Sequence, residues 1–190
     1  MMDKGCMSMG GVDGTSAATI EIRGNTIISN YNNVMLCDGY GKSNNTRWYS
    51  NTFVKIGDRS DYSTIRIGVS GDVSTGHEFY DSVFQGGASY ASTVFVSGHG
   101  ETWYKVGWTL TVTTTANASV QIEDSTEAVV SSGTANGSGI YTATLVQYKQ
   151  EDSAGKTYYT DHHVEVTLGQ DFNETDVTMD ATKGIELYPV

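Results

Sequence analysis

Two short patterns recur along the first half of this chain, and an internal repeat limits the available folds more strongly than any single motif does. The first pattern is an apolar residue, followed three positions later by Asn and five positions later by a second apolar residue. It fits Ile22, Asn25 and Ile27. Further copies are Trp48, Asn51 and Phe53, then Phe79, Ser82 and Phe84, and a degraded copy at Trp103, Val106 and Trp108, with starts spaced by 26, 31 and 24 residues.

The second pattern is an alternating pair of apolar residues that falls between these copies. Its members are Val34 with Leu36, Ile65 with Ile67 and Val94 with Val96, spaced by 31 and 29 residues, with Met7 and Met9 as a partial earlier pair. Two patterns that advance together predict a coil in which alternate residues of each strand point inward. Stacked copies then pair their strands in parallel and bury like residues on like. We expect the Asn at each turn to hydrogen-bond the turn backbone and the next coil.

A family resemblance follows from these segments. The stretches IEIRGNTIIS, RWYSNTFVKI and EFYDSVFQGG, with NNVMLCDG, YSTIRIG and STVFVSG between them, resemble the right-handed parallel β-helix of the pectate-lyase-like superfamily. The resemblance covers roughly residues 5–105 and implies a short β-helix of about three to four rungs. A twisted antiparallel sandwich with the same spacing is the alternative.

The second half of the chain shows a cleaner alternation of apolar residues, and turn signals interrupt it at 115–118, 136–139, 153–156 and 168–169. About seven short strands separated by such turns predict a β-sandwich. The segment ASVQIEDSTEAVVSSGTANGSGIYTATLVQY resembles the carboxypeptidase-regulatory-like, immunoglobulin-like sandwiches, which are typically non-catalytic spacers or adhesion units. It departs from their pattern at Glu127, where Gly is expected.

The two halves predict an all-β chain with two domains, residues 1–105 and 106–190. No linker separates them, because Trp103 to Val112 is nearly continuous strand sequence. Strong helix formers are scarce, so almost no helix is expected.

Charge and hydropathy exclude some partners. The net charge of −11 argues against nucleic acid or an anionic membrane surface, since like charges repel. No apolar run approaches the ~20 residues of a membrane span, so membrane insertion is not expected. The composition suits an extracellular or cell-surface protein. The first coil would leave open strand edges, so we expect it to dock on an upstream region or on another chain, a second copy included.

The outward residues next to the repeat positions are the best candidates for a glycan site. Arg23, Tyr49, Tyr80 and Tyr104 would stack as an exposed column, about 4.8 Å apart per coil. Aromatic faces bind the apolar faces of sugars, and an arginine suits an acidic sugar. A purely structural ladder of stacked side chains is the alternative.

Other reactive residues give weaker signals. Asp58, Asp61 and Asp72, with His77 and Glu78 close by in the sequence, form an acidic loop that predicts either a Ca²⁺ site or a solvated loop; no other cofactor is expected. The histidines and the cysteines give no specific functional signal. His99, His162 and His163 are expected at the surface, the adjacent pair on opposite strand faces, and Cys6 and Cys37 are expected either as free thiols or as a disulfide.

These patterns leave three functions open. The first is a non-catalytic extracellular or cell-surface module with a structural or adhesive role and a glycan as its ligand. The second is the C-terminal part of a polysaccharide lyase or glycoside hydrolase, and the third is a phage tail-spike or fibre fragment. The motifs of nucleophile elbows, phosphate loops and dinucleotide sites are not found in the sequence.

Overall fold

The structure is a computed structural model, and it describes residues 5–9, 20–36, 43–57, 61–68, 73–96 and 101–190. These residues form an all-β chain, in which the one helical element is a 3₁₀ turn, η1 (Tyr90–Ser92). None of the described helices is long and apolar enough to cross a membrane. The chain forms two compact units: unit 1 is residues 1–105 with 150–156, and unit 2 is residues 106–149 with 157–190.

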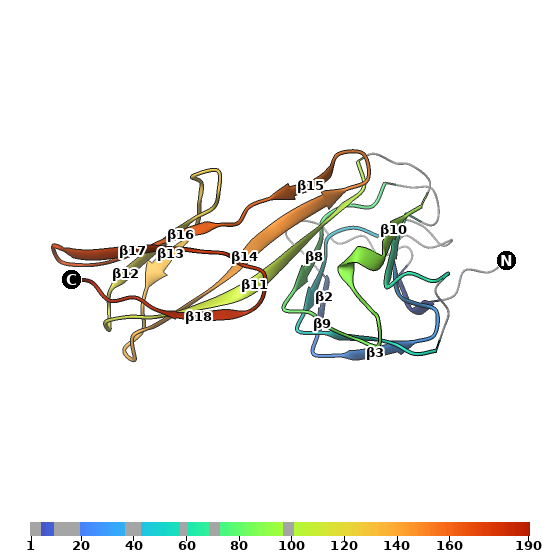
Figure 1. Ribbon diagram of the computed structural model, residues 1–190, viewed down its shortest axis with the longest axis horizontal. Coiled ribbons are helices and arrows are strands. Elements are labelled where there is room, and N and C mark those ends of the chain that lie inside the picture. Colours follow the sequence, from blue (N-terminus) through green and yellow to red (C-terminus); the bar gives the residue numbers. More distant parts are fainter. Residues whose placement is uncertain (1–4, 10–19, 37–42, 58–60, 69–72, 97–100) are drawn as a thin grey trace. The chain divides into compact units, whose positions relative to one another are not determined.

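Unit 1 consists of parallel strands that the chain adds to three sheets in rotation, drawn in blue to green in Figure 1. The first sheet has the order β1 (Gly5–Met9), β4 (Asn32–Leu36), β7 (Ile65–Ile67), β10 (Thr93–Phe95). The second contains β2 (Ile20–Arg23), β5 (Thr46–Tyr49) and β8 (His77–Tyr80), followed by the start of β11 (Trp103–Thr113). The third contains β3 (Thr26–Ser29), β6 (Thr52–Lys55) and β9 (Val83–Gln85).

The register of these strands confirms the predicted repeat. Ile22 pairs with Trp48 and Trp48 pairs with Phe79, both in parallel. In the first sheet Met7 pairs with Val34, and Val34 with Ile65. The antiparallel alternative is therefore wrong for these strands.

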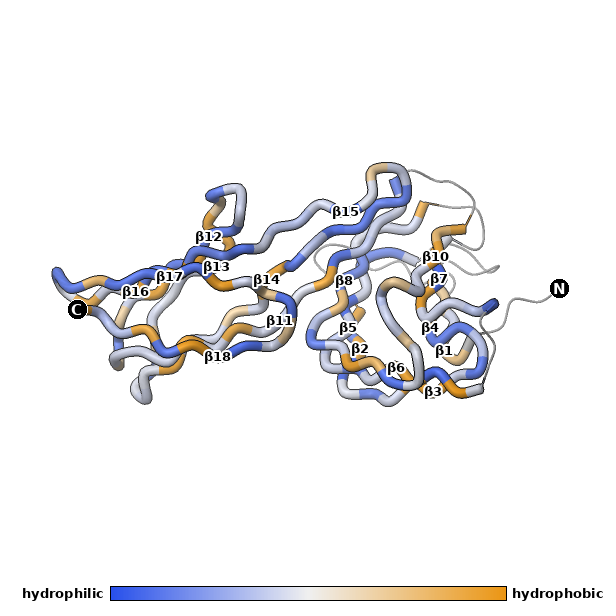
Figure 2. Tube along the Cα trace, in the orientation of Figure 1, coloured by the Kyte–Doolittle hydropathy of each residue, from blue (hydrophilic) through white to orange (hydrophobic). Residues whose placement is uncertain are grey.

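Like residues are buried on like inside unit 1. The side chains of Trp48, Phe53 and Phe79 are all 0% exposed. The Trp48 and Phe79 rings stack with centroids 5.5 Å apart, and those of Phe53 and Phe84 with centroids 5.6 Å apart. In Figure 2 the hydrophobic colour recurs at β3, β6 and β10. The parallel pairing of successive strands thus places the Trp48 ring beside the Phe79 ring and the Phe53 ring beside the Phe84 ring.

Polar side chains at the turns link one coil to the next. The Oδ1 atom of Asn32 accepts the backbone N–H of Ser63 at 3.0 Å, and the Oδ1 atom of Asn44 accepts the backbone N–H of Thr75 at 2.9 Å. Successive coils also approach closely: a Cβ on Gly86, whose φ is +63°, would lie 2.0 Å from the carbonyl oxygen of Lys55. The two hydrogen bonds from Ser63 and Thr75 satisfy backbone N–H groups that a turn would otherwise leave unpaired inside the unit.

The last coil differs from its prediction by one residue in two places. Thr93 and Phe95 pair with Ile65 and Ile67, so Val94 points outward and is 48% exposed. In β11 Tyr104 is only 1% exposed, whereas Trp103 is half-buried. A shift of one residue moves every side chain of a strand to the opposite face. The inward positions of Val94, Val96 and Trp103 are therefore corrected to Thr93, Phe95 and Tyr104.

Unit 2 contains two sheets whose side chains meet in one core. One sheet joins the end of β11 to β14 (Ile140–Glu151) and, in parallel, to β18 (Lys183–Glu186); β14 also pairs with β15 (Gly155–Tyr158). The other is antiparallel, with the order β13 (Val129–Thr134), β12 (Ser119–Glu123), β16 (His162–Leu168), β17 (Asp171–Val177).

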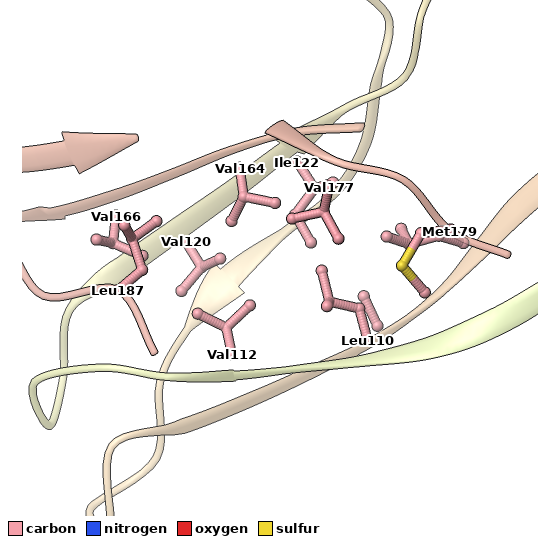
Figure 3. Packing of buried hydrophobic residues seen from close by; sticks show 11 residues of the cluster. Leu110, Val112, Val120, Ile122, Val164, Val166, Val177, Met179 and Leu187 are labelled. Carbon is pink, nitrogen blue, oxygen red and sulfur yellow. The ribbon is translucent and has the colours of Figure 1, made fainter. Parts of the chain in front are cut away.

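The core of unit 2 is aliphatic. Leu110 and Val112 from β11 face Ile122 and Val164 from the other sheet, as Figure 3 shows. All four side chains are 0% exposed, and each such burial stabilises the fold by roughly 1.5–3 kcal/mol. The alternation of apolar residues predicted for the second half of the chain is confirmed at these positions.

Candidate functional site

Unit 1 contains a cleft of about 220 Å³ at its last coil. The lining residues are Tyr90, Ala91, Thr93, Phe95, Tyr104, Gln150 and Lys156. Three of the seven are aromatic, and Lys156 is the one charged residue. All seven belong to unit 1, because residues 150–156 pack with that unit.

The aromatic walls of the cleft continue the ring column of the interior. The Tyr90 ring meets Phe84 edge-on with centroids 4.5 Å apart, and the Tyr104 ring meets Phe79 edge-on at 6.0 Å. Phe95 lies against Tyr104 at 5.9 Å. Since each wall ring is packed on another ring, the cleft is formed before any ligand arrives.

Local hydrogen bonds fix the segment that carries Tyr90. The Ser89 hydroxyl accepts the backbone N–H of Ser92 at 3.3 Å, which caps η1. The Thr93 hydroxyl donates to the carbonyl of Tyr90 at 2.8 Å, and the Tyr104 hydroxyl lies 3.5 Å from the Thr93 oxygen. Burial raises the pKa of the Tyr90 hydroxyl, so Tyr90 acts as a neutral ring.

The polar rim comes from the end of β14, with Gln150, and from the start of β15, with Lys156. The backbone N–H of Asp152, in the turn between these strands, donates to the carbonyl of Thr102, just before β11, at 3.1 Å. The Gln150 amide donates to the carbonyl of Glu151 at 3.1 Å, and the Lys156 side chain is exposed. The lining therefore combines flat apolar faces with an amide, a hydroxyl and an ammonium group, which are the groups that bind a sugar ring.

The predicted column of four exposed residues is only partly formed. On the outer face of β2, β5 and β8, the Arg23 guanidinium lies 3.9 Å from the centroid of the Tyr49 ring, and Tyr49 lies 5.3 Å from Tyr80. Tyr80 and Tyr104 are, however, 8% and 1% exposed. The prediction of exposure is wrong for these two: burial raises the pKa of Tyr80, and Tyr104 turns inward to line the cleft.

Charges on the same face are paired within it. Glu21 binds Arg23 at 2.8 Å, and Arg47 binds Glu78 at 2.5 Å. The hydrogen bond to Glu78 raises the pKa of Arg47. With Arg23 covering Tyr49, this face presents ion pairs rather than open ring faces.

Of the three residues predicted to bind calcium, the structure describes Asp61 alone. Asp58 and Asp72 lie outside the described residues, as do Cys37 and His99. Burial lowers the pKa of Lys55, and the negative charge of Asp61 partly opposes this shift. No group of three metal-binding side chains occurs among the residues described. Cys6 carries a free, exposed thiol.

His77 belongs to β8 and is fully buried, which corrects its assignment to the acidic loop. Its Nδ1 lies 2.7 Å from the Thr46 hydroxyl and its Nε2 lies 2.8 Å from the Ser74 hydroxyl. Ser74 donates to the carbonyl of Ser43 at 2.5 Å, so its oxygen must accept from Nε2–H. Nδ1 then accepts from Thr46, whose oxygen accepts the indole N–H of Trp48 at 2.8 Å.

This chain of hydrogen bonds keeps His77 neutral. Burial lowers its pKa to about 3. The network is sealed inside the unit, where a neutral imidazole serves as a polar part of the core.

The adjacent histidines of β16 point to opposite faces, as predicted, but only one lies at the surface. His162 is 0% exposed, and neither ring nitrogen has a hydrogen-bond partner among the described residues. Burial lowers its pKa against the opposing charges of Asp124 and Asp161. The expected surface position of His162 is therefore wrong, because it shares its strand face with the core residue Val164.

Comparisons with known proteins add nothing to this geometry: no family model, no curated protein and no solved structure matches the chain. Sequence reasoning singled out Tyr104 and missed the six other residues of the cleft lining, which are Tyr90, Ala91, Thr93, Phe95, Gln150 and Lys156. A signal existed for Phe95, because Thr93 and Phe95 lie 28 residues after Ile65 and Ile67. Gln150 and Lys156 could not be found by spacing, since they come from outside the repeat.

Proposed function

We propose that this chain is a non-catalytic structural module of an extracellular or cell-surface protein, and that it binds a carbohydrate in the aromatic cleft of unit 1. The observation that carries the proposal is the cleft lining, with three rings that are already packed on the interior column and polar groups on the rim.

The finer fold assignment is part of the same proposal. Strands that visit three parallel sheets in rotation, with polar side chains linking successive turns, support a short right-handed parallel β-helix for unit 1. Two sheets that share one aliphatic core support an immunoglobulin-like β-sandwich for unit 2. Both architectures serve many functions, so the function rests on the cleft and not on the fold.

A sugar fits this cleft for physical reasons. A pyranose ring has one face of C–H groups, which packs on an aromatic ring, and an edge of hydroxyls, which needs hydrogen-bond partners. Phe95 and Tyr90 are partly exposed and supply aromatic rings for the C–H face. The hydrogen-bond partners for the hydroxyls come from Thr93, Gln150 and Lys156. The lining, as far as the structure describes it, holds no carboxylate and therefore no acid–base pair for glycoside hydrolysis.

The experiment is a glycan array probed with the purified chain and two variants. Ala91 is exposed and lines the cleft, so Ala91→Trp fills the cleft without removing a packed ring. Ala181, an exposed residue of unit 2, gives the matched control Ala181→Trp. We expect glycan binding by the natural chain and by the control, and loss of binding in Ala91→Trp. No binding to any glycan, or equal binding by Ala91→Trp, would refute the proposal.

A further inference from the structure

We infer that the open edge of β13 in unit 2 pairs with the same edge of a second copy of this chain, which gives a weak dimer with two-fold symmetry. The inference concerns unit 2 and is independent of the cleft in unit 1. It is carried by three observations on β13: one side of the strand is unpaired, the strand carries no charge, and its free backbone groups match those of a second copy.

The strand β13 (Val129–Thr134) ends the antiparallel sheet of unit 2 (Figure 1). It pairs with β12, and within unit 2, all of whose residues the structure describes, no strand pairs with its other side. Its inward face is held in place, because the Ser131 hydroxyl lies 2.6 Å from the Tyr141 hydroxyl and a Cβ on Gly133 would lie 2.8 Å from the Tyr141 ring. An ordered strand with an open edge offers its backbone N–H and C=O groups to another strand.

The hydrogen bonds to β12 show which backbone groups of β13 face the open edge. The N–H of Ala135, just after the strand, donates to the carbonyl of Ala118 at 2.9 Å. Hydrogen-bonded and non-hydrogen-bonded pairs alternate along an antiparallel ladder, so Gly133, two positions earlier, also bonds toward β12. The residues between these positions, Ser132 and Thr134, therefore direct their N–H and C=O groups toward the open edge.

These free groups match those of a second copy in the antiparallel direction. A pairing centred on Ser132 sets this residue opposite Ser132 of the other copy, about 5.5 Å apart between Cα atoms, with two N–H···O bonds exchanged. It also sets Thr134 opposite Val130, which is 45% exposed, and two β-branched side chains stabilise such a cross-strand pair. The register shift of β13 lies at its Val129 end, away from the centre of this pairing. The contact uses the same patch on both copies and closes after two of them.

Charge selects a second copy for this edge and excludes it from the others. Unit 2 carries two basic and ten acidic residues, a net charge of −8, so two copies repel each other over most of its surface. The strand β13 contains no charged residue. In the pairing centred on Ser132, Glu127, the nearest acidic residue along the chain, lies toward Gly137 of the other copy and away from the second Glu127. The other strands at sheet ends carry charges, as open edges commonly do: Lys156 in β15, Asp171, Glu174 and Asp176 in β17, and Lys183 and Glu186 in β18.

Sedimentation equilibrium of the full chain at physiological salt tests the dimer. One strand pair covers less surface than the ~1,200–2,000 Å² of a standard interface, so we expect a dissociation constant between about 10 µM and 1 mM. The mean mass should therefore rise with protein concentration from 20.5 kDa toward twice that value.

Two matched variants locate the contact. Ser132→Glu places two carboxylates directly opposite each other in the dimer, where like charges are destabilising. Gln121→Glu adds the same charge on β12, at the exposed residue that pairs with Ser132. Its carboxylate would lie about 14 Å from its counterpart, three strand spacings away and beyond the ~8 Å screening length. We expect the dissociation constant to rise at least tenfold in Ser132→Glu and less than twofold in Gln121→Glu.

Amide hydrogen exchange at low and high protein concentration gives a second readout. The N–H groups of Ser132 and Thr134 should gain protection as the concentration rises, and that of Glu174 on β17 should not. A chain that stays monomeric over the whole range, equal self-association of the two variants, or protection at β17 instead of β13 would overturn the inference. None of these results bears on the glycan array, because the cleft belongs to unit 1.

Discussion

The side-chain oxygen of Asn51 accepts the backbone N–H of Asn25 at 3.0 Å, although the two residues are 26 positions apart in the sequence. The amide nitrogen of Asn51 donates in turn to the carbonyl of Ile22 at 2.9 Å. Asn51 is 0% exposed, so it connects two turns of unit 1 from the inside. The repeat of Asn with apolar neighbours is therefore a repeat of contacts between coils.

Replacing Asn51 by Ala should destabilise unit 1 strongly. The change leaves the partly buried backbone N–H of Asn25 and the buried carbonyl of Ile22 without these partners, and an unpaired buried polar group costs about 1–3 kcal/mol. We expect the free energy of unfolding, measured in urea by tryptophan fluorescence, to fall by about 2–4 kcal/mol. The control is Asn25→Ala, since Asn25 is the same residue type but exposed. A loss there as large as that at Asn51 would contradict the assigned roles.

His77 should make unit 1 sensitive to acid. Its folded pKa is lowered to about 3 by burial, so below pH 6.5 the unfolded chain binds a proton that the folded chain does not. Stability is then lost as the pH falls from about 6.5 toward 3. Between pH 6.5 and 4.5 the loss from this residue is about 2–3 kcal/mol.

The measurement compares the natural chain with His77→Gln at several pH values. Urea unfolding should show a shallower dependence on pH in the variant, whatever its stability at pH 7. Buried His162, whose pKa is also lowered, is present in both proteins and cancels in the comparison. Parallel pH curves for the two proteins would rule out a neutral, buried His77.

The sequence predicts the coils of unit 1 because similar residues are buried on one another in successive coils. They therefore recur at regular intervals in the sequence. Ile22, Trp48 and Phe79 pair as the spacing requires. Thr46 and His77 each lie two positions before a repeat residue, Trp48 and Phe79 respectively. The same spacing therefore predicts the contact between Thr46 and His77.

The last coil and the cleft could not be predicted in the same way. Residues 93–96 read Thr-Val-Phe-Val. Whether residues 93 and 95 or residues 94 and 96 point inward, two uncharged side chains are buried. Only pairing with Ile65 and Ile67 decides between them. Tyr104 was misplaced for the same reason. Its true position, with Phe95 beside it, creates the cleft, and the rim from residues 150–156 depends on folding that no repeat encodes.

The core of unit 2 should depend on single aliphatic side chains. Ile122 is 0% exposed and packs between the two sheets, so Ile122→Ala should cost about 2–5 kcal/mol, from lost burial and the cavity left behind. Val129 lies on the neighbouring strand β13 but is 54% exposed, so Val129→Ala should change stability by less than about 0.5 kcal/mol. Thermal unfolding of both variants gives the comparison, and similar melting temperatures would contradict the assigned core.

The pKa of His163 should be shifted in the direction opposite to that of its neighbour His162. Its Nδ1 lies 2.9 Å from a carboxylate oxygen of Asp176, and this hydrogen bond, with the charges of Glu174 and Glu123, raises the pKa of His163. The stabilisation from this pair is complete below pH 6.5 and is lost as the pH rises through the raised pKa. NMR titration of the imidazole protons should therefore show one histidine of β16 titrating above pH 6.5 and the other below it. Asp176→Asn should lower the His163 value and leave His162 unchanged; two histidines that both titrate near 6.5 would show that the strand does not separate a buried face from an acidic one.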